Sequence, residues 1–289
     1  MRELARATLA GVPVGGSAPV VVIGALNVSP ESFYAGSVHA RPDDLVTAAR
    51  RMVEAGAALI DVGARSTAPY GTTTLPESAE ADRLARAVAA LAARVPVPIS
   101  ADTCRVGPAR AALEAGARVI NDVGALRDPE LVALVAEHEV GLILMASPDP
   151  AVPAEPGRDA APVARVEAVL RAALARARAA GIPDERIVLD PGIGFFRGEA
   201  VPWDQWDVAV LAGLPALGAL GRPLCVGVSR KSFLGAITGR ADPAERLAAS
   251  LAAAAAAVLG GAAAIRTHDV SATLDAVRVA ERVRGALRS

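Results

Sequence analysis

The stretch SADTCRVGPARAALEAGARVINDVGAL, residues 100–126, contains one helical segment between two apolar runs that end in polar pairs. The run VPVPIS leads into Asp102-Thr103, and the run ARVI leads into Asn121-Asp122. The segment between them is rich in alanine and arginine, which favour helix, and it ends in Gly116, a residue that typically stops one. The stretch therefore predicts strand, helix and strand, with a carboxylate and an amide at the two strand ends.

The same unit is repeated along the whole chain of 289 residues. Short apolar runs that predict strands occur eight times: VVVIGALN (20–27), ALIDVG (58–63), VPISAD (97–102), RVIND (118–122), GLILMAS (141–147), RIVLDPG (186–192), PLCVGVS (223–229) and AAIRTHD (263–269). Helices are predicted over Pro42–Gly56, Glu77–Arg94, Pro108–Gly116, Pro129–Glu139, Val163–Gly181, Trp206–Leu220, Asp242–Gly260 and Ser271–Leu287.

Strand and helix that alternate eight times, with nearly continuous apolar strands, indicate a parallel sheet covered by helices. The length suits one (β/α)8 barrel, which typically takes about 250 residues. We therefore predict an α/β fold with a single TIM-barrel domain over residues 1–289. The alternative is an open doubly wound sheet, because periodicity alone does not prove closure. The proline-rich segment 147–159 is predicted to be a loop after the fifth strand.

Composition excludes several classes of protein. The net charge of −1 gives no reason to expect a nucleic acid partner. Two distant cysteines, Cys104 and Cys225, fit neither a disulfide framework nor a zinc site and are typical of a reducing compartment. The N-terminus lacks the apolar core of a signal peptide, and the apolar stretch Leu247–Ala264 reads as a buried helix running into a strand. We expect a cytoplasmic protein that does not enter the membrane.

Polar side chains follow the strands where each one ends. They are Asn27, Asp61, Asp102, Asn121, Ser147, Asp190, Ser229, Arg230, Lys231, Arg266 and His268. A single residue of this kind can be explained as a helix cap, a turn residue or a surface charge. In a barrel, however, all carboxyl ends of the strands meet at one rim, where active sites are built. The pattern therefore predicts a site at that rim.

The motifs in these loops resemble those of the dihydropteroate synthase family, in order and over nearly the whole chain. The similar segments are GALNVSPESF, LIDVGARSTAP, ISADTCRV, ARVINDV, IVLDPGIGF, VGVSRKSFLG and IRTHDV. The resemblance implies a pterin-binding barrel with transferase activity. Such an enzyme condenses 6-hydroxymethyl-dihydropterin diphosphate with an arylamine and releases diphosphate.

The resemblance also implies roles for individual residues. Pterin binding is expected from Asp102, Asn121, Met145, Asp190, Phe195 and Lys231, and catalytic roles from Asp102, Lys231 and Arg266. Diphosphate binding is expected from Asn27, Thr67, Arg266 and His268, and arylamine binding from Ser232, Pro69 and Phe195. Asn27 is also expected to help hold Mg²⁺, which keeps mostly water and phosphate oxygens as ligands.

Several loops depart from the family's usual pattern. STAPYG stands where STRPG is common, so Ala68 replaces an arginine; MAS replaces MHM, FYAGS replaces FSDGG, and GFFRG replaces GFGK. The segments SPESFYAGSV, STAPY and PWDQWD together resemble a branch of the family linked to methanopterin-type cofactors. The arylamine is then either p-aminobenzoate or a ribosylated aminobenzene phosphate, whose phosphate could be held by Arg65, Arg105 or Arg197.

Two other functions remain open at this point. A pterin-dependent methyltransferase acting with a corrinoid protein shares the barrel, although it does not need the Arg266 and His268 pair. A non-catalytic pterin-binding protein would explain the altered loops.

We also expect a homodimer, because AASLAAAAAAVLGGAA (248–263) is unusually apolar for an outer helix. The alternative is that this face packs wholly against the last two strands.

Overall fold

The barrel predicted from the sequence is present in the computed structural model, which describes residues 5–29, 41–65, 75–151, 161–198 and 201–287. Eight parallel strands form one sheet in the order β8-β7-β6-β5-β4-β3-β10-β9. Their bounds are Val21–Asn27 (β3), Leu59–Gly63 (β4), Ile99–Asp102 (β5), Val119–Asp122 (β6), Gly141–Met145 (β7), Ile187–Asp190 (β8), Cys225–Gly227 (β9) and Ala264–Thr267 (β10). A bridge between Leu189 and Leu224 joins β8 to β9 and closes the ring.

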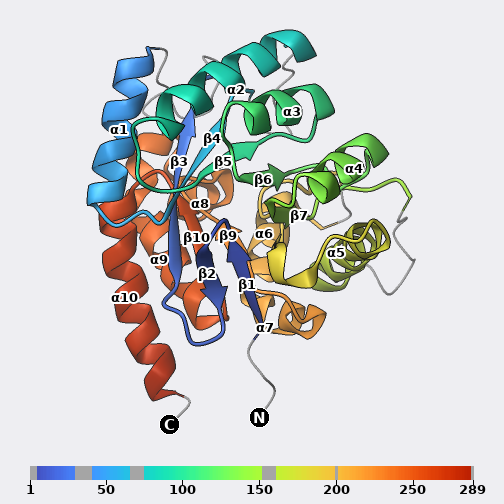
Figure 1. Ribbon diagram of the computed structural model, residues 1–289. Helices are drawn as coiled ribbons and strands as arrows, with labels where there is room; N and C mark the ends of the chain where they lie inside the picture. The colour runs from blue at the N-terminus through green and yellow to red at the C-terminus, as the bar shows by residue number, and fades with distance from the viewer. Residues whose placement is uncertain (1–4, 30–40, 66–74, 152–160, 199–200, 288–289) are drawn as a thin grey trace.

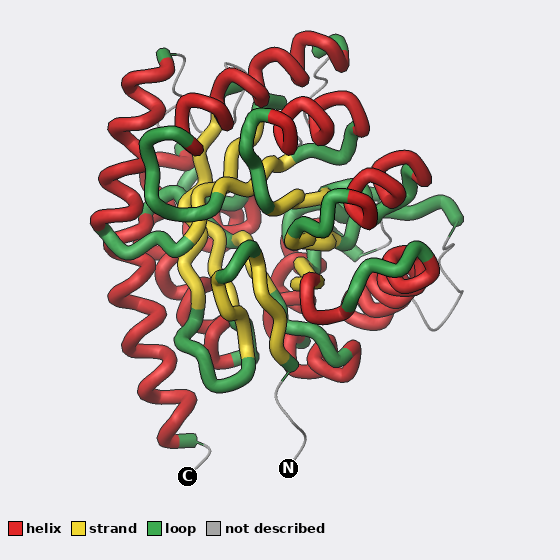
Figure 2. The backbone as a smooth tube through the Cα atoms, viewed as in Figure 1, coloured by secondary structure: helices red, strands yellow, loops and turns green. Residues whose placement is uncertain are grey.

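Helices surround this ring of strands (Figures 1 and 2). They are Pro42–Glu54 (α1), Glu77–Ala92 (α2), Val106–Glu114 (α3), Pro129–Glu137 (α4), Pro162–Ala179 (α5), Trp203–Ala212 (α6), Leu214–Leu217 (α7), Ser232–Thr238 (α8), Leu247–Leu259 (α9) and Val270–Ala286 (α10). The predicted stops at Gly56, Gly116 and Gly181 are confirmed: each lies just beyond a helix end with positive φ.

Three helix predictions needed correction. The span Trp206–Leu220 is broken, because α6 ends at Ala212 with Gly213 as its C-cap, and Pro215, two residues further on, has no N–H to continue the helix. The span Asp242–Gly260 begins as a 3₁₀ turn, η4 (Pro243–Arg246), before α9. The third predicted helix begins at Val106, since Pro108 lies in the first turn, where its missing N–H costs nothing.

A short helix and a β-hairpin were not predicted. The short helix α8 follows β9 directly and ends at Gly239. At the other end of the barrel, β1 (Arg6–Leu9) and β2 (Val12–Gly15) form an antiparallel hairpin. Its two turn residues, Ala10 and Gly11, both have positive φ, as this tight hairpin turn requires. The two strands are only four residues long, which makes them hard to recognise in the sequence.

The hairpin fills the amino-terminal mouth of the barrel (Figure 1). Leu9 and Val14 pack with the inward-facing residues of the barrel strands, which are Val21, Ile23, Leu59, Val119, Ile143, Val188, Cys225 and Ala264. Gly141 at the start of β7 makes room for this contact: a Cβ there would lie 3.0 Å from Leu9 Cδ2. This end of the barrel is therefore apolar and closed.

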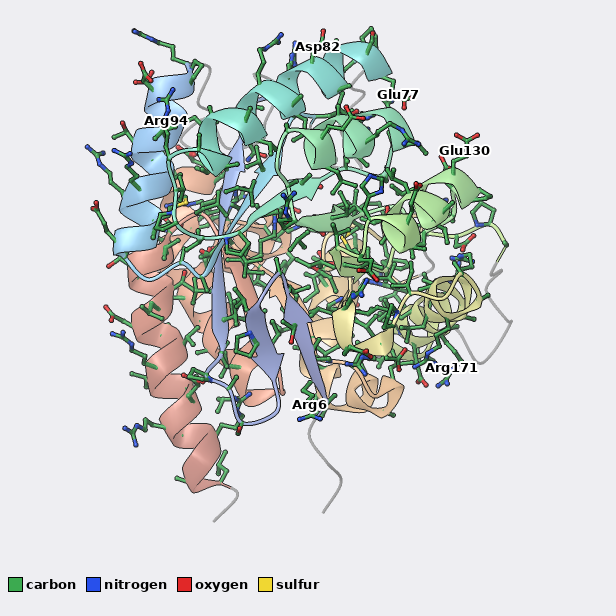
Figure 3. All side chains as sticks on the ribbon, in the orientation of Figure 1. Arg6, Glu77, Asp82, Arg94, Glu130 and Arg171 are labelled. Atoms are coloured by element: carbon green, nitrogen blue, oxygen red, sulfur yellow. The ribbon has the colours of Figure 1, made fainter. Side chains whose placement is uncertain are left out.

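The outward-facing strand residues pack on the helices in a second, larger cluster. The outer ring closes where α10 passes α1, and Gly56 after α1 lies against Leu274 of α10 (Figure 1). Charged side chains such as Asp82, Glu130 and Arg171 point away from the barrel (Figure 3). No helix in the described parts of the chain is long and apolar enough to cross a membrane.

We predict that Leu9→Ala lowers the free energy of unfolding by about 2–5 kcal/mol, the usual cost of truncating a fully buried leucine. Leu9 is 0% exposed. Thr8→Ala, at an exposed position of the same strand, is the matched control and should change stability by about 0.5 kcal/mol or less. Urea unfolding measures both. Equal small effects would show that the hairpin contributes little to the barrel.

Candidate active site

The carboxyl ends of the strands carry the polar residues that the sequence placed there. Because side chains alternate along a strand, the residue two positions after an inward apolar residue also faces the interior. Leu59, Val119, Val188 and Ala264 are thus followed inside the barrel by Asp61, Asn121, Asp190 and Arg266. The interior changes from apolar to polar over two residues along each of these strands.

Arg266 binds two carboxylates inside the barrel mouth. Its Nε donates to Asp61 Oδ2 at 2.6 Å, and its Nη2 donates to Asp102 Oδ2 at 2.8 Å. Asn121 Nδ2 also donates to Asp61 Oδ2, at 3.1 Å. The pKa of Arg266 is raised: burial lowers it, but the charges of Asp61 and Asp102 outweigh that effect. The guanidinium therefore stays charged and links β10 to β4 and β5.

Asp102 retains unused capacity to accept hydrogen bonds. Burial raises its pKa to about 7, with Arg266 and, less strongly, Arg65 acting in the opposite direction. Its Oδ1 is buried and has no hydrogen-bond partner among the described residues, and the same is true of Asp61 Oδ1. A buried carboxylate oxygen without a donor costs free energy. A ligand with N–H groups would supply the missing donors.

Asp190 and Lys231 lie on the opposite side of the mouth. Asp190 Oδ1 accepts the N–H of Gly192 at 2.8 Å, and burial raises the Asp190 pKa to about 6. Burial lowers the pKa of Lys231 to about 8, opposed by the charge of Asp190. Lys231 Nζ lies 4.8 Å from the centre of the Phe195 ring. Met145 pairs in register with Asp190 and is buried beside it.

The turn after Asp190 has a conformation that only glycine permits. Gly192 has φ +68°, and a Cβ there would lie 2.0 Å from the carbonyl oxygen of Ala146. Any side chain at this position would displace the loop that carries Phe195.

His268 is bonded to the neighbouring loop after β9. Its Nδ1 lies 3.0 Å from Ser229 Oγ. Burial, followed by the charges of Arg266, Arg230 and Lys231, lowers the pKa of His268 to about 3. The imidazole is therefore neutral near pH 7 and lies among three cations, an environment that favours an anionic ligand.

A second arginine, Arg197, fixes the loop after β8. Its Nε donates to the carbonyl of Gly194 at 3.0 Å, and its Nη2 donates to Ser232 Oγ at 2.9 Å. Its guanidinium stacks on Trp203 and lies 3.7 Å from Asp207. Asp207 in turn accepts the N–H of Gly194 at 2.7 Å. Phe195 and Ser232, which were both predicted to bind the arylamine, are held by this one network.

Asn27 is compatible with a Mg²⁺ ligand. A Cβ at Gly63 would meet Asn27 Oδ1 at 3.3 Å and Asp102 Oδ2 at 3.6 Å, so oxygens from β3 and β5 flank the missing side chain. The described residues contain no group of three or more His, Cys, Asp or Glu that could hold a metal. The amide oxygen of Asn27 is the kind of hard oxygen donor that Mg²⁺ accepts alongside water and phosphate ligands.

The predicted pterin residues, together with Arg266, His268 and Asn27, all lie at the barrel mouth. Thr67 and Pro69, like Ala68, lie outside the described residues. The contribution of one residue was underestimated. Asp61 was predicted only as a rim residue, although it is fully buried below the rim and binds both Arg266 and Asn121. Its position two residues after the inward-facing Leu59 could have indicated this.

Known proteins resemble the chain over almost its full length. The family model described as pterin binding enzyme matches residues 23–268. The dihydropteroate synthase of Mycobacterium leprae is 42% identical over 272 residues, which cover 91% of this chain and 93% of that one. The Escherichia coli dihydropteroate synthase is 37% identical over 261 residues, 90% of each chain.

Solved structures agree with these relatives. The Xanthomonas albilineans dihydropteroate synthase with 4-aminobenzoic acid has a TM-score of 0.84 and 38% identity, covering 97% of this chain and 98% of that one. The same enzyme in complex with 7,8-dihydropteroate has a TM-score of 0.81 and 36% identity, covering 96% and 98%.

We predict that stability falls as the pH rises from 5 to 7. Burial raises the pKa of Asp102 to about 7 and those of Asp190 and Asp122 to about 6, against 3.8 for an unperturbed aspartate. In this range the folded state holds protons that the unfolded chain has lost, so their release lowers the free energy of unfolding.

His268 acts in the opposite direction: its pKa is lowered to about 3, so in this range the unfolded chain binds a proton that the folded state lacks. It is one group against the three aspartates. The expected net loss is about 1–3 kcal/mol. Urea unfolding at pH 5, 6 and 7 measures it. A free energy of unfolding that increases steadily over this range would contradict the assignment.

Proposed function

The chain belongs to the dihydropteroate synthase family of pterin-binding enzymes, and we propose on this premise that its barrel mouth is a transferase active site. The reaction condenses 6-hydroxymethyl-dihydropterin diphosphate with p-aminobenzoate and releases diphosphate. The observation that carries this proposal is the cluster of Asp102, Asn121, Asp190 and Lys231 around Arg266, which offers paired acceptors and one cation to a flat polar ligand.

The pterin edge matches these groups chemically. It presents adjacent amide and amine N–H donors, which the carboxylates of Asp102 and Asp190 and the amide of Asn121 can accept. Lys231 would donate to the ring carbonyl. Met145 and Phe195 supply apolar contacts to the ring faces. Bound in this way, a pterin would satisfy Asp102 Oδ1, which lacks a hydrogen-bond donor within the described chain.

The diphosphate would lie toward β3 and β10, next to Asn27, Arg266 and His268, with Thr67 as a further predicted contact. Mg²⁺, held on the protein side by Asn27, would neutralise part of the diphosphate charge. Because His268 is neutral before binding, it can donate one N–H, and an adjacent dianion would raise its pKa. These groups stabilise the departing anion, which is the usual catalytic requirement in such a transfer.

The bond changes are simple. The arylamine nitrogen attacks the methylene carbon of the pterin, the carbon–oxygen bond to diphosphate breaks, and the amine loses a proton. No covalent enzyme intermediate is needed. The roles of the chain are to hold the pterin through Asp102 and Lys231, to stabilise the leaving group through Arg266, and to orient the amine between Phe195, Ser232 and Pro69.

Two features favour p-aminobenzoate over a ribosylated aminobenzene phosphate. Relatives with 4-aminobenzoic acid and 7,8-dihydropteroate share the fold at 36–38% identity. In addition, Arg105 and Arg197, two of the three arginines that could have held a second phosphate, each have a carboxylate partner, Glu80 or Asp207. The methanopterin-type substrate is therefore the less favoured alternative.

The corrinoid-dependent methyltransferase and the non-catalytic pterin-binding protein are also less favoured. The curated relatives over the full length are named as synthases. Arg266 and His268 on β10 provide groups for an anion that methyl transfer does not require.

We further propose a homodimer in the cytoplasm. Within the described chain, the large apolar residues that are exposed lie on four neighbouring helices, α6, α8, α9 and α10: Val208, Ile237, Leu259, Val279, Val283 and Leu287. On α9, Ala248, Ala252 and Ala256 are also exposed, at intervals of four residues. Part of this predicted apolar face therefore does not pack against the strands. The free cysteines Cys104 and Cys225 fit a reducing compartment.

We predict that the protein releases diphosphate from the pterin diphosphate only when p-aminobenzoate and Mg²⁺ are present. Asp190→Ala should fold and yet bind pterin about ten- to a hundredfold more weakly, because it removes a charged acceptor at the mouth. Steady-state assays compare kcat/KM for the two arylamines, and calorimetry measures the affinity of the variant for the pterin. A higher kcat/KM for the phosphorylated amine would overturn the choice of substrate, and near-native pterin affinity in the variant would place the site elsewhere.

We predict a dimer at micromolar concentration, with the mass of two chains in sedimentation. Val279→Asp with Val283→Asp introduces charge on exposed α10 positions and should yield monomer with unchanged unfolding behaviour. Arg278→Asp, on the same helix, is the control for added negative charge and is also exposed. A monomeric wild-type protein would exclude the dimer.

A further inference from the structure

A buried glutamate, Glu80, lies outside the cluster that binds the pterin. It is in the first turn of α2 and is 1% exposed. Its Oε1 accepts the hydroxyl of Thr103 at 2.7 Å. Its Oε2 accepts Arg65 Nε and Arg105 Nη1, each at 3.1 Å. One buried carboxylate thus binds both the loop after β4 and the loop after β5. Neither the architecture of the barrel nor the pterin cluster explains why a carboxylate is buried at this position.

The two arginines differ in how many hydrogen bonds they donate. Arg105 Nη1 also donates to the carbonyl of Leu75 at 3.0 Å, and its backbone N–H donates to Thr103 Oγ1. Arg65 Nη2, in contrast, lies 3.6 Å from Cys104 Sγ, a weak acceptor. Because one carboxylate serves two guanidiniums, the cluster has one positive charge in excess. Among the described residues, Arg65 is therefore the member of the cluster with N–H donors to spare.

Arg65 lies on the side of the mouth assigned to the diphosphate. Arg65 lies two residues beyond Gly63, the last residue of β4. Gly63 pairs in register with Asn27 of β3 on one side and with Asp102 of β5 on the other. Its guanidinium is near enough for its charge to act on the Asp102 carboxyl. Arg266, the other cation on this side, already spans two carboxylates. A leaving diphosphate carries more charge than one such shared guanidinium can offset.

We propose that Arg65 is a diphosphate-binding residue of this enzyme and that buried Glu80 positions it. The inference rests on the proposed function. Glu80 holds the Nε side of the guanidinium by a charge-assisted bond, so the terminal nitrogens are not used in the contact with Glu80. The hydrogen bond from Thr103 to Glu80 places the same carboxylate close to Asp102, which precedes Thr103 in the sequence. Arg65 therefore recognises the diphosphate group and makes no contribution to binding of the pterin ring.

The experiment compares three ligands by calorimetry with Mg²⁺ present: the pterin diphosphate, the corresponding pterin alcohol, and inorganic diphosphate. Arg65→Met should weaken both diphosphate ligands about ten- to a hundredfold, as expected for loss of a charged hydrogen bond, and change the alcohol less than twofold. Arg65→Lys should recover part of the loss. Arg110→Met, at an exposed position on α3, removes the same charge and should change none of them.

The positioning role of Glu80 is tested by a double-mutant cycle. If Glu80 directs Arg65, the effect of Arg65→Met on inorganic diphosphate binding should be several-fold smaller in a Glu80→Gln background. Strictly additive effects would overturn the positioning role. Equal losses for the pterin alcohol and the pterin diphosphate in Arg65→Met would overturn the binding role.

Failure of the proposed function has a separate signature. If the wild-type protein releases no diphosphate with either arylamine, the assigned reaction is wrong. Binding of inorganic diphosphate to wild type and to Arg65→Met still decides the role of Arg65.

Discussion

The ion pairs of Arg266 with Asp61 and Asp102 are the constraint on which the mouth of this barrel depends. Asp61 and Asp102 are buried and Arg266 is half-buried inside the mouth, where an unpaired charge would be costly. The pairing fixes the guanidinium and aligns the two carboxylates. It leaves one oxygen of each carboxylate without a donor in the described chain. The protein thus retains acceptors that a pterin can use.

The two ends of the barrel are built differently, and this difference places the site. At the amino-terminal end, the β1–β2 hairpin inserts Leu9 and Val14 among apolar strand residues. At the carboxyl end, the same strands carry aspartate, asparagine and arginine two residues later. A closed apolar end can supply stability, so the other end can hold strained and buried polar groups. The raised pKa values of Asp102 and Asp190 are the physical sign of that cost.

Around the mouth, buried carboxylates outside the pterin cluster hold the loops. Glu80 binds Arg65, Arg105 and Thr103, Asp207 binds the loop that carries Phe195, and Asp122 accepts the N–H groups of Gly124 and Leu126. Each of these acids satisfies donors that a loop cannot pair within itself. Loops held in this way can present side chains in fixed positions. This arrangement suits an enzyme that must orient two substrates.

The sequence by itself determined the eight strands, most of the helices and the rim on which the polar residues gather. It could do so because apolar runs and glycine stops are local signals, and because all strand ends of a parallel barrel meet at one side. Only the tertiary structure decided which charges pair. Asp61 and Arg266 are 205 residues apart, and Arg65 and Glu80 belong to different elements, so no local pattern connects them. The hairpin was missed for the same reason: its strands are short, and the signal that defines it is the apolar barrel end against which it packs.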